Sequence, residues 1–191
     1  PAERVARLRP AAEQGGFHSS VRWLATCRDQ PFDGCGEGLV DALLGGAEQG
    51  EALPTLILAH AYAKGVGVPA DEAAAMALLD KAEAILGGKG HGAVEYARIG
   101  FLLGEVNLGE GLTARLKAAA DSTPVADAML ALEAIETGDN RIPAPLLERL
   151  RLGADKGSPI AAGLLAVEVA VHGKPAEAAP LLARAAELGH P

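Results

Sequence analysis

Residues 56–87 read LILAHAYAKGVGVPADEAAAMALLDKAEAILG and hold two helical patterns separated by a glycine-rich turn. In the first pattern, the apolar run Leu56–Ala59 is followed one turn later by Tyr62, which gives the helix an apolar face. Glycines and a proline at 65–69 end that helix, and Asp71 is expected to cap the second helix by accepting from N–H groups of its first turn. The stretch predicts a helical hairpin.

The end of this stretch recurs along the chain. Similar pentapeptides close at positions 15, 50, 122, 157 and 189, and a longer match, 81–84 running on to Gly87, fills the gap after 50. The six closing positions lie 32 to 37 residues apart. Each interval holds two helical patterns, so the period indicates a helix-turn-helix repeat whose hairpins stack because one hairpin cannot bury its apolar face alone. The expected units are a partial one at 1–15 and complete ones at 16–50, 51–87, 88–122, 123–157 and 158–191.

The two ends of the sequence fall at informative points of this period. Residue 1 lies inside a unit, and the junction at 188–191 resembles the one at 156–159. We therefore expect the chain to be a fragment of a longer protein with further domains.

The amino-acid composition favours helices and argues against nucleic-acid-binding and membrane-inserted proteins. The 191 residues are 49% hydrophobic but only 3% aromatic, and Ala, Leu and Glu outnumber the β-branched residues, which predicts an all-α fold. A net charge of −8 argues against a nucleic-acid partner, because phosphate binding needs an excess of Lys and Arg. No apolar run reaches the roughly 20 residues that span a bilayer, so direct membrane insertion is not expected.

The clearest unit resembles the Sel-like repeat family, a relative of the tetratricopeptide repeats. Residues 58–62 are similar to the family's Leu-Gly-x-x-Tyr helix, 65–71 to its Gly-x-Gly-Val turn, and 81–82 to its Lys-Ala ending. The other units depart from the pattern. At the Tyr62 position they have Leu103, Ile135 and Ala170, and two of their turns, at 138–140 and 173–175, differ from the Gly-x-Gly-Val sequence. The resemblance implies a right-handed α-solenoid of about five repeats that acts as a non-enzymatic scaffold and binds a partner protein or peptide on its concave face.

Aligning the first helices of the units predicts which side chains recur on that face. Two columns emerge, four residues apart: His60, Phe101, Glu133 and Glu168, then Lys64, Glu105, Thr137 and His172. Because residues i and i+4 share a helix face, the columns form adjacent stripes of mixed but acidic character. They are either solvated helix faces or a binding surface that favours a partner with Lys or Arg.

The two cysteines fall on one expected hairpin. Cys27 lies near the end of its first helix and Cys35 near the start of its second, so the hairpin could bring them together as a disulfide or leave two reduced residues. A secreted branch of the Sel-like repeats also carries Cys pairs with seven intervening residues. A disulfide would imply an oxidising compartment such as the periplasm, and reduced thiols the cytoplasm.

No further pattern supports catalysis, a cofactor or a metal. The histidines lack partners at metal-ligand spacing, and they stand at His18, His60, His91, His172 and His190. The glycine-rich segment 87–92 could suggest a phosphate loop, but it lacks the Gly-x-x-x-x-Gly-Lys-Ser/Thr order and follows a helix, so a linker is expected.

Aromatic residues bear on the remaining alternatives. Trp23 is expected in the core, although an exposed Trp23 with Phe17 could dock a neighbouring domain. A second function would be a regulatory or cell-envelope assembly module that recognises a cell-wall glycan or a secretion component, with saccharides stacking on Trp23, Tyr62 or Phe101. The scarcity of aromatic residues tells against that function.

Overall fold

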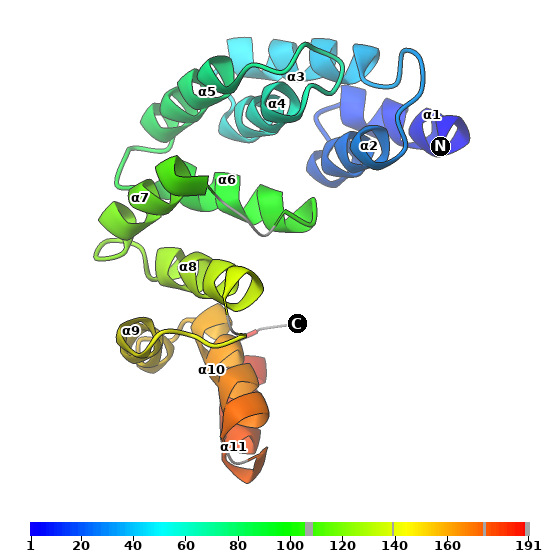
Figure 1. Ribbon diagram of the computed structural model, residues 1–191. Helices are drawn as coiled ribbons and strands as arrows, with labels where there is room; N and C mark the ends of the chain where they lie inside the picture. The colour runs from blue at the N-terminus through cyan, green and yellow to red at the C-terminus, as the bar shows by residue number, and fades with distance from the viewer. Residues whose placement is uncertain (106–108, 139, 174, 190–191) are drawn as a thin grey trace. The chain divides into compact units, whose positions relative to one another are not determined.

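The structure is a computed structural model and describes residues 1–105, 109–138, 140–173 and 175–189 (Figure 1). Within these ranges the chain forms eleven α-helices and no β-strand, which confirms the predicted all-α fold of successive helical hairpins. Four positions of the predicted turns, junction and histidine set lie outside the described residues: Asp139, Lys174, His190 and Pro191.

The chain divides into two compact units, Pro1–Glu105 and Val106–Pro191. The first unit contains α1 (Ala2–Glu13), α2 (Phe17–Asp29), α3 (Glu37–Glu48), α4 (Ala52–Lys64), α5 (Glu72–Ile85) and α6 (His91–Leu102). The described part of the second contains α7 (Gly109–Ala119), α8 (Pro124–Thr137), α9 (Ala144–Asp155), α10 (Pro159–His172) and α11 (Pro175–Glu187).

Helix α4 lies at the centre of the first unit and packs against α2, α3, α5 and α6. Its residues 55–61 are all buried, so the helix is covered on every side. The predicted turn follows it, with Gly65 ending α4 in the left-handed conformation. Asp71 accepts from the Ala74 N–H at 2.9 Å, which confirms the predicted cap of α5.

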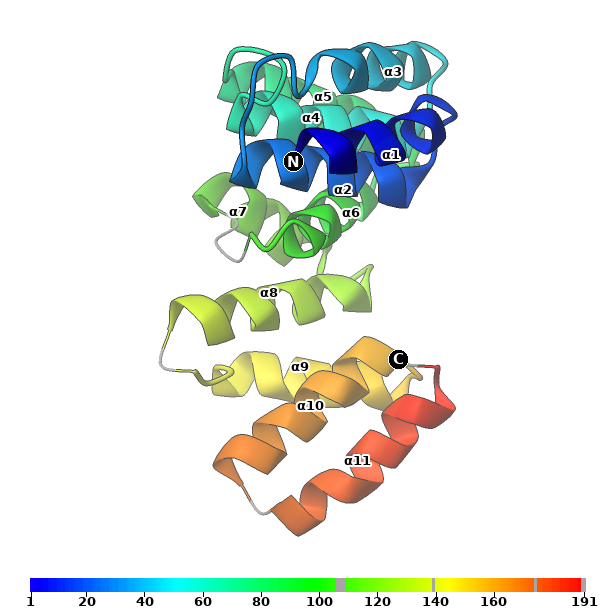
Figure 2. The same cartoon turned by 90° about the vertical axis from the view of Figure 1, so that its right-hand side faces the viewer.

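The second unit repeats the hairpin arrangement. Helices α8 and α10 contribute the buried stretches 126–131 and 164–166, and α10 packs along α11, as Figure 2 shows. Ser158 caps α10 by accepting from Ala161 N–H at 3.3 Å, and Pro159 occupies the first turn, where its missing N–H costs nothing.

The helices follow the expected period closely. From residue 16 onward, each expected repeat holds two helices, beginning with α2 and α3 in 16–50 and ending with α10 and α11 in 158–191. The division between the compact units falls between α6 and α7, inside the expected repeat 88–122. That one continuous repeat domain spans the chain stays a prediction.

The loop from α2 to α3 is fastened to α2 in two ways. A disulfide joins Cys27 and Cys35, whose Cα atoms lie 5.6 Å apart. Trp23 is fully buried, as expected of a core residue, and its indole N–H donates to the Cys35 carbonyl at 2.6 Å. The Arg9 guanidinium of α1 lies 5.2 Å from the centre of the Trp23 ring, so the indole contacts α1 as well as the loop.

Candidate functional site

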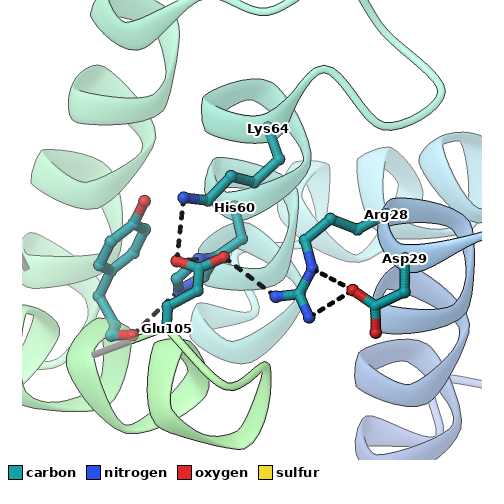
Figure 3. Close-up of polar contacts among 6 residues, drawn as sticks. Arg28, Asp29, His60, Lys64 and Glu105 are labelled. Atoms are coloured by element: carbon teal, nitrogen blue, oxygen red, sulfur yellow. Dashed lines mark hydrogen bonds and ion pairs between the residues drawn. The ribbon is translucent and has the colours of Figure 1, made fainter. Parts of the chain in front are cut away.

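Two residues of the predicted columns, His60 and Lys64, lie beside the carboxylate of a third, Glu105, in the first unit (Figure 3). Glu105 Oε2 lies 3.3 Å from Lys64 Nζ and 3.6 Å from His60 Nδ1. Lys64 and His60 are one turn apart on α4, whereas Glu105 follows α6. One carboxylate therefore joins two neighbouring repeats, in contacts between α4 and the segment after α6 that the spacing of residues within one helix does not predict.

The backbone after α6 explains how Glu105 reaches this point. Gly104 adopts a positive φ of 77°, a conformation that other residues rarely adopt. The chain turns back, and the Glu105 N–H donates to the Gly100 carbonyl at 2.8 Å, closing the helix end. This turn directs the Glu105 side chain toward α4 (Figure 3).

A third helix contributes Arg28, at the end of α2. Its Nη1 lies 3.6 Å from Glu105 Oε1, and its Nε and Nη2 lie 2.8 and 2.7 Å from the Asp29 carboxylate. Asp29 occupies the Lys64 column one repeat earlier, so extending the alignment backward would have found it. Arg28 stands outside both columns, and only its long side chain brings it into the cluster. We call Arg28, His60, Lys64 and Glu105 the Glu105 cluster.

His60 is buried, with 1% of its surface exposed, and lies between two different acceptors. Its Nε2 is 3.0 Å from the Tyr96 carbonyl, and its ring stacks on the Tyr96 ring with centres 3.8 Å apart. Because a carbonyl oxygen only accepts, Nε2 must carry hydrogen in this contact. His60 Nδ1 then faces Glu105 Oε2 and makes no hydrogen bond in the described structure.

The cluster perturbs two acid groups. Burial acts to raise the pKa of Glu105, but His60 and Lys64, through their contacts and charges, outweigh it and hold that pKa below its usual range. Burial, with the Glu105 and Glu72 charges, raises the pKa of Tyr96, so Tyr96 stays a neutral phenol. Glu105 is thus a carboxylate surrounded by basic groups from two helices, an arrangement that fastens α2, α4 and the end of α6 together.

Phe101, the remaining predicted residue of this unit, lies near the end of α6 and is half-buried. The contacts around the Glu105 carboxylate are made by Arg28, His60 and Lys64, so the structure does not join Phe101 to this cluster.

The same two columns have other partners in the second unit. Both oxygens of Glu133 lie within 3.0 Å of the Thr113 hydroxyl of α7, and Thr137 donates to the Glu133 carbonyl of its own helix. Glu168 accepts from the Ile142 N–H at 3.3 Å. His172 Nε2 lies 2.5 Å from the Asn140 carbonyl.

A groove of about 510 Å³ opens beside Glu133 and Thr137. Its apolar lining comes from the residue after α7, from α8, and from the start of α9 with the residue before it, and it comprises Ala120, Leu130, Ala134, Pro143, Pro145 and Leu146. Its charged rim carries Lys117, Asp127 and Arg149, of which Arg149 and Asp127 pair at 2.8 Å. We call it the α8–α9 groove.

The segment 87–92, which could have suggested a phosphate loop, already holds an anion of the chain itself. The Glu83 carboxylate accepts from the N–H groups of Gly90 at 2.5 Å, Gly92 at 2.6 Å and Ala93 at 3.2 Å. These amides at the start of α6 therefore bind α5, which agrees with the expected linker. In the described part of the chain, no three His, Cys, Asp or Glu side chains are grouped to hold a metal, and no helix is long and apolar enough to cross a membrane.

These features define an all-α protein of successive helical hairpins, joined by polar contacts between repeats. No family model and no curated protein matches the chain. Among solved structures, the chain is similar to the one described as the crystal structure of a Sel1 repeat protein from Oxalobacter formigenes, with 22% sequence identity and a TM-score of 0.45. The alignment covers 97% of this chain and 55% of that one, so the chain spans about half the length of that protein.

Proposed function

We propose that the protein is a non-enzymatic scaffold that binds a partner protein or peptide along the face formed by its first helices. The observation that carries this proposal is the α8–α9 groove, which adjoins Glu133 and Thr137, two residues of the predicted stripes. Small apolar grooves with a charged rim are typical of surfaces that receive a peptide side chain and orient its neighbours.

The lining indicates the kind of segment that would fit. Leu130 and Leu146 offer an apolar floor, and Arg149 is already neutralised by Asp127. Glu133 gives the rim an acidic group, which favours a partner with Lys or Arg there, while Lys117 lies on the same rim. A segment with an apolar anchor flanked by charged residues would complement this groove.

Affinity capture from native extract tests the proposal with three forms of the chain. Lys117→Glu combined with Thr137→Arg changes the rim of the groove at two exposed positions. Lys156→Glu makes the same lysine change at an exposed position outside the lining and serves as the matched control.

The wild type and the Lys156→Glu control should retain the same proteins, and the double variant should lose them. Equal retention by all three forms, or a wild type that retains no protein, would contradict a binding role for this face.

A further inference from the structure

A second groove lies in the first unit, away from the Glu105 cluster. It is bounded by the end of α1, the start of α2, α3 from Asp41 onward and the start of α4, and its volume is about 720 Å³. We call it the α1–α3–α4 groove; the three helices can be followed in Figure 2. No residue of the predicted stripes lines it.

The ionisable side chains that line this groove all carry the same sign. They are Glu13, Asp41 and Glu51, and no Lys, Arg or His is among the lining residues. Glu13 has one distant partner, Arg9, at 3.9 Å. Asp41 and Glu51 form no ion pair within the described residues, so their charges are available to a ligand with positive charge.

The rest of the lining suits a peptide. Phe17 and Leu53 present partly exposed apolar surface, and Leu53 is 37% exposed. Gln14 and Gln49 supply exposed amide groups that can both donate to and accept from a peptide backbone. A segment that carries Lys or Arg beside an apolar residue would match the charges, the apolar surface and the amides together.

Two adjacent glycines in α3 bear directly on this groove. Glycine in a helix interior is unfavourable, so each needs a reason. Gly46 has one, because a Cβ there would lie 2.7 Å from the Pro54 side chain. Gly45 does not, because a Cβ there would meet no heavy atom within 4 Å. Gly45 lines the groove, and because it has no side chain, the space beside it stays open.

We propose that the α1–α3–α4 groove binds a peptide segment of a partner protein that carries Lys or Arg next to an apolar side chain. Charge complementarity selects the basic residue, and the open space at Gly45 admits the segment. This surface is separate from the α8–α9 groove, so either binding role can fail while the other holds.

Fluorescence anisotropy with defined probes tests the inference on the full chain. The probes are a set of labelled 12-residue peptides in which lysines alternate with leucine, alanine and serine, and a matched set in which glutamate replaces every lysine. The wild type should bind members of the lysine set and none of the glutamate set, and its affinity should fall as salt is raised.

Two variants with matched controls separate groove binding from general attraction to an acidic protein. Gly45→Leu fills the groove, and Gly111→Leu makes the same change in α7 at a site that is also open and lines no part of this groove. Asp41→Lys reverses a charge in the groove, and Asp155→Lys does so at an exposed position elsewhere.

Gly45→Leu and Asp41→Lys should each weaken lysine-peptide binding by about tenfold or more, while both controls bind as the wild type does. Because Gly45 and Gly111 are helical and unobstructed, both leucine variants should keep or raise the melting temperature, which shows that they fold. The inference is overturned if no lysine peptide binds the wild type, or if Gly45→Leu binds as tightly as Gly111→Leu. Capture through the α8–α9 groove should not change in Gly45→Leu.

Discussion

In the first unit, one carboxylate, Glu105, lies near Arg28, His60 and Lys64, whereas in the second unit the column residues Glu133 and Glu168 are held by a hydroxyl and a backbone amide. The first arrangement joins side chains of α2, α4 and the segment after α6 at a partly buried point. The second keeps one of its two carboxylates, Glu133, beside the α8–α9 groove. Corresponding positions of the repeat can thus hold helices together in the first unit and border a groove in the second.

The two units also differ in how their loops are fastened. The first has the Cys27–Cys35 disulfide and the buried Trp23. The second has no disulfide, because both cysteines of the sequence lie in the first unit. Changes at Trp23 or at the disulfide of the first unit should therefore lower the free energy of unfolding more than changes at the column residues of the second.

The largest effect is expected from Trp23→Ala. The indole is fully buried, so the change leaves a cavity and removes the donor to the Cys35 carbonyl, at a cost of about 3 to 5 kcal/mol in the free energy of unfolding. Denaturant unfolding followed by far-ultraviolet circular dichroism measures it. Trp23→Phe keeps most of the volume and should cost less; equal costs for the two variants would mean that the cavity is not the cause.

The next effect comes from the disulfide. Replacing Cys27 and Cys35 by serine opens a short loop and should lower the free energy of unfolding by about 2 to 3 kcal/mol in the chain-entropy model. Reduction of the wild type should lower the free energy of unfolding by the same amount, which is measured as a lower denaturant midpoint. A wild type whose midpoint is insensitive to reductant would contradict this contribution.

A smaller effect, matched across the units, is expected at the carboxylates. Glu105→Gln keeps the shape of the side chain but removes the charge that Arg28 and His60 face, and should cost about 1 to 2 kcal/mol. The Lys64 contact adds little because Lys64 is partly exposed to solvent. Glu133→Gln retains an acceptor for Thr113 and should cost less than about 1 kcal/mol. Equal costs would remove the distinction between the two units.

The sequence predicts the helices better than it predicts these clusters. The 35-residue period and Asp71 suffice for the hairpins, because caps and apolar spacing act locally. Aligned columns also select His60, Lys64 and Glu105 as candidate residues. The columns cannot predict the contact with the Tyr96 carbonyl, because any residue type can provide a backbone carbonyl. They also cannot predict Arg28, because Arg28 lies outside both columns. The α1–α3–α4 groove depends on Gly45, whose role appears only once neighbouring atoms are placed.

The smallest effect concerns pH. Because the pKa of Glu105 is lower in the folded protein than in the unfolded chain, the carboxylate contributes stability above its unfolded value of about 4.3, and that contribution is lost as pH falls through the folded value. The wild type should therefore lose more stability than Glu105→Gln between pH 5 and about pH 3. Parallel pH profiles for the two proteins would show that Glu105 is not stabilised by its neighbours.

Hydrogen exchange measured by mass spectrometry on Glu105→Gln tests most directly whether this carboxylate holds the first unit together. We expect faster exchange in α2 and α4, whose side chains contact Glu105, and in α6, which Glu105 follows. Exchange in α8 to α11 should not change. Unchanged exchange throughout, or an equal increase in both units, would contradict this expectation.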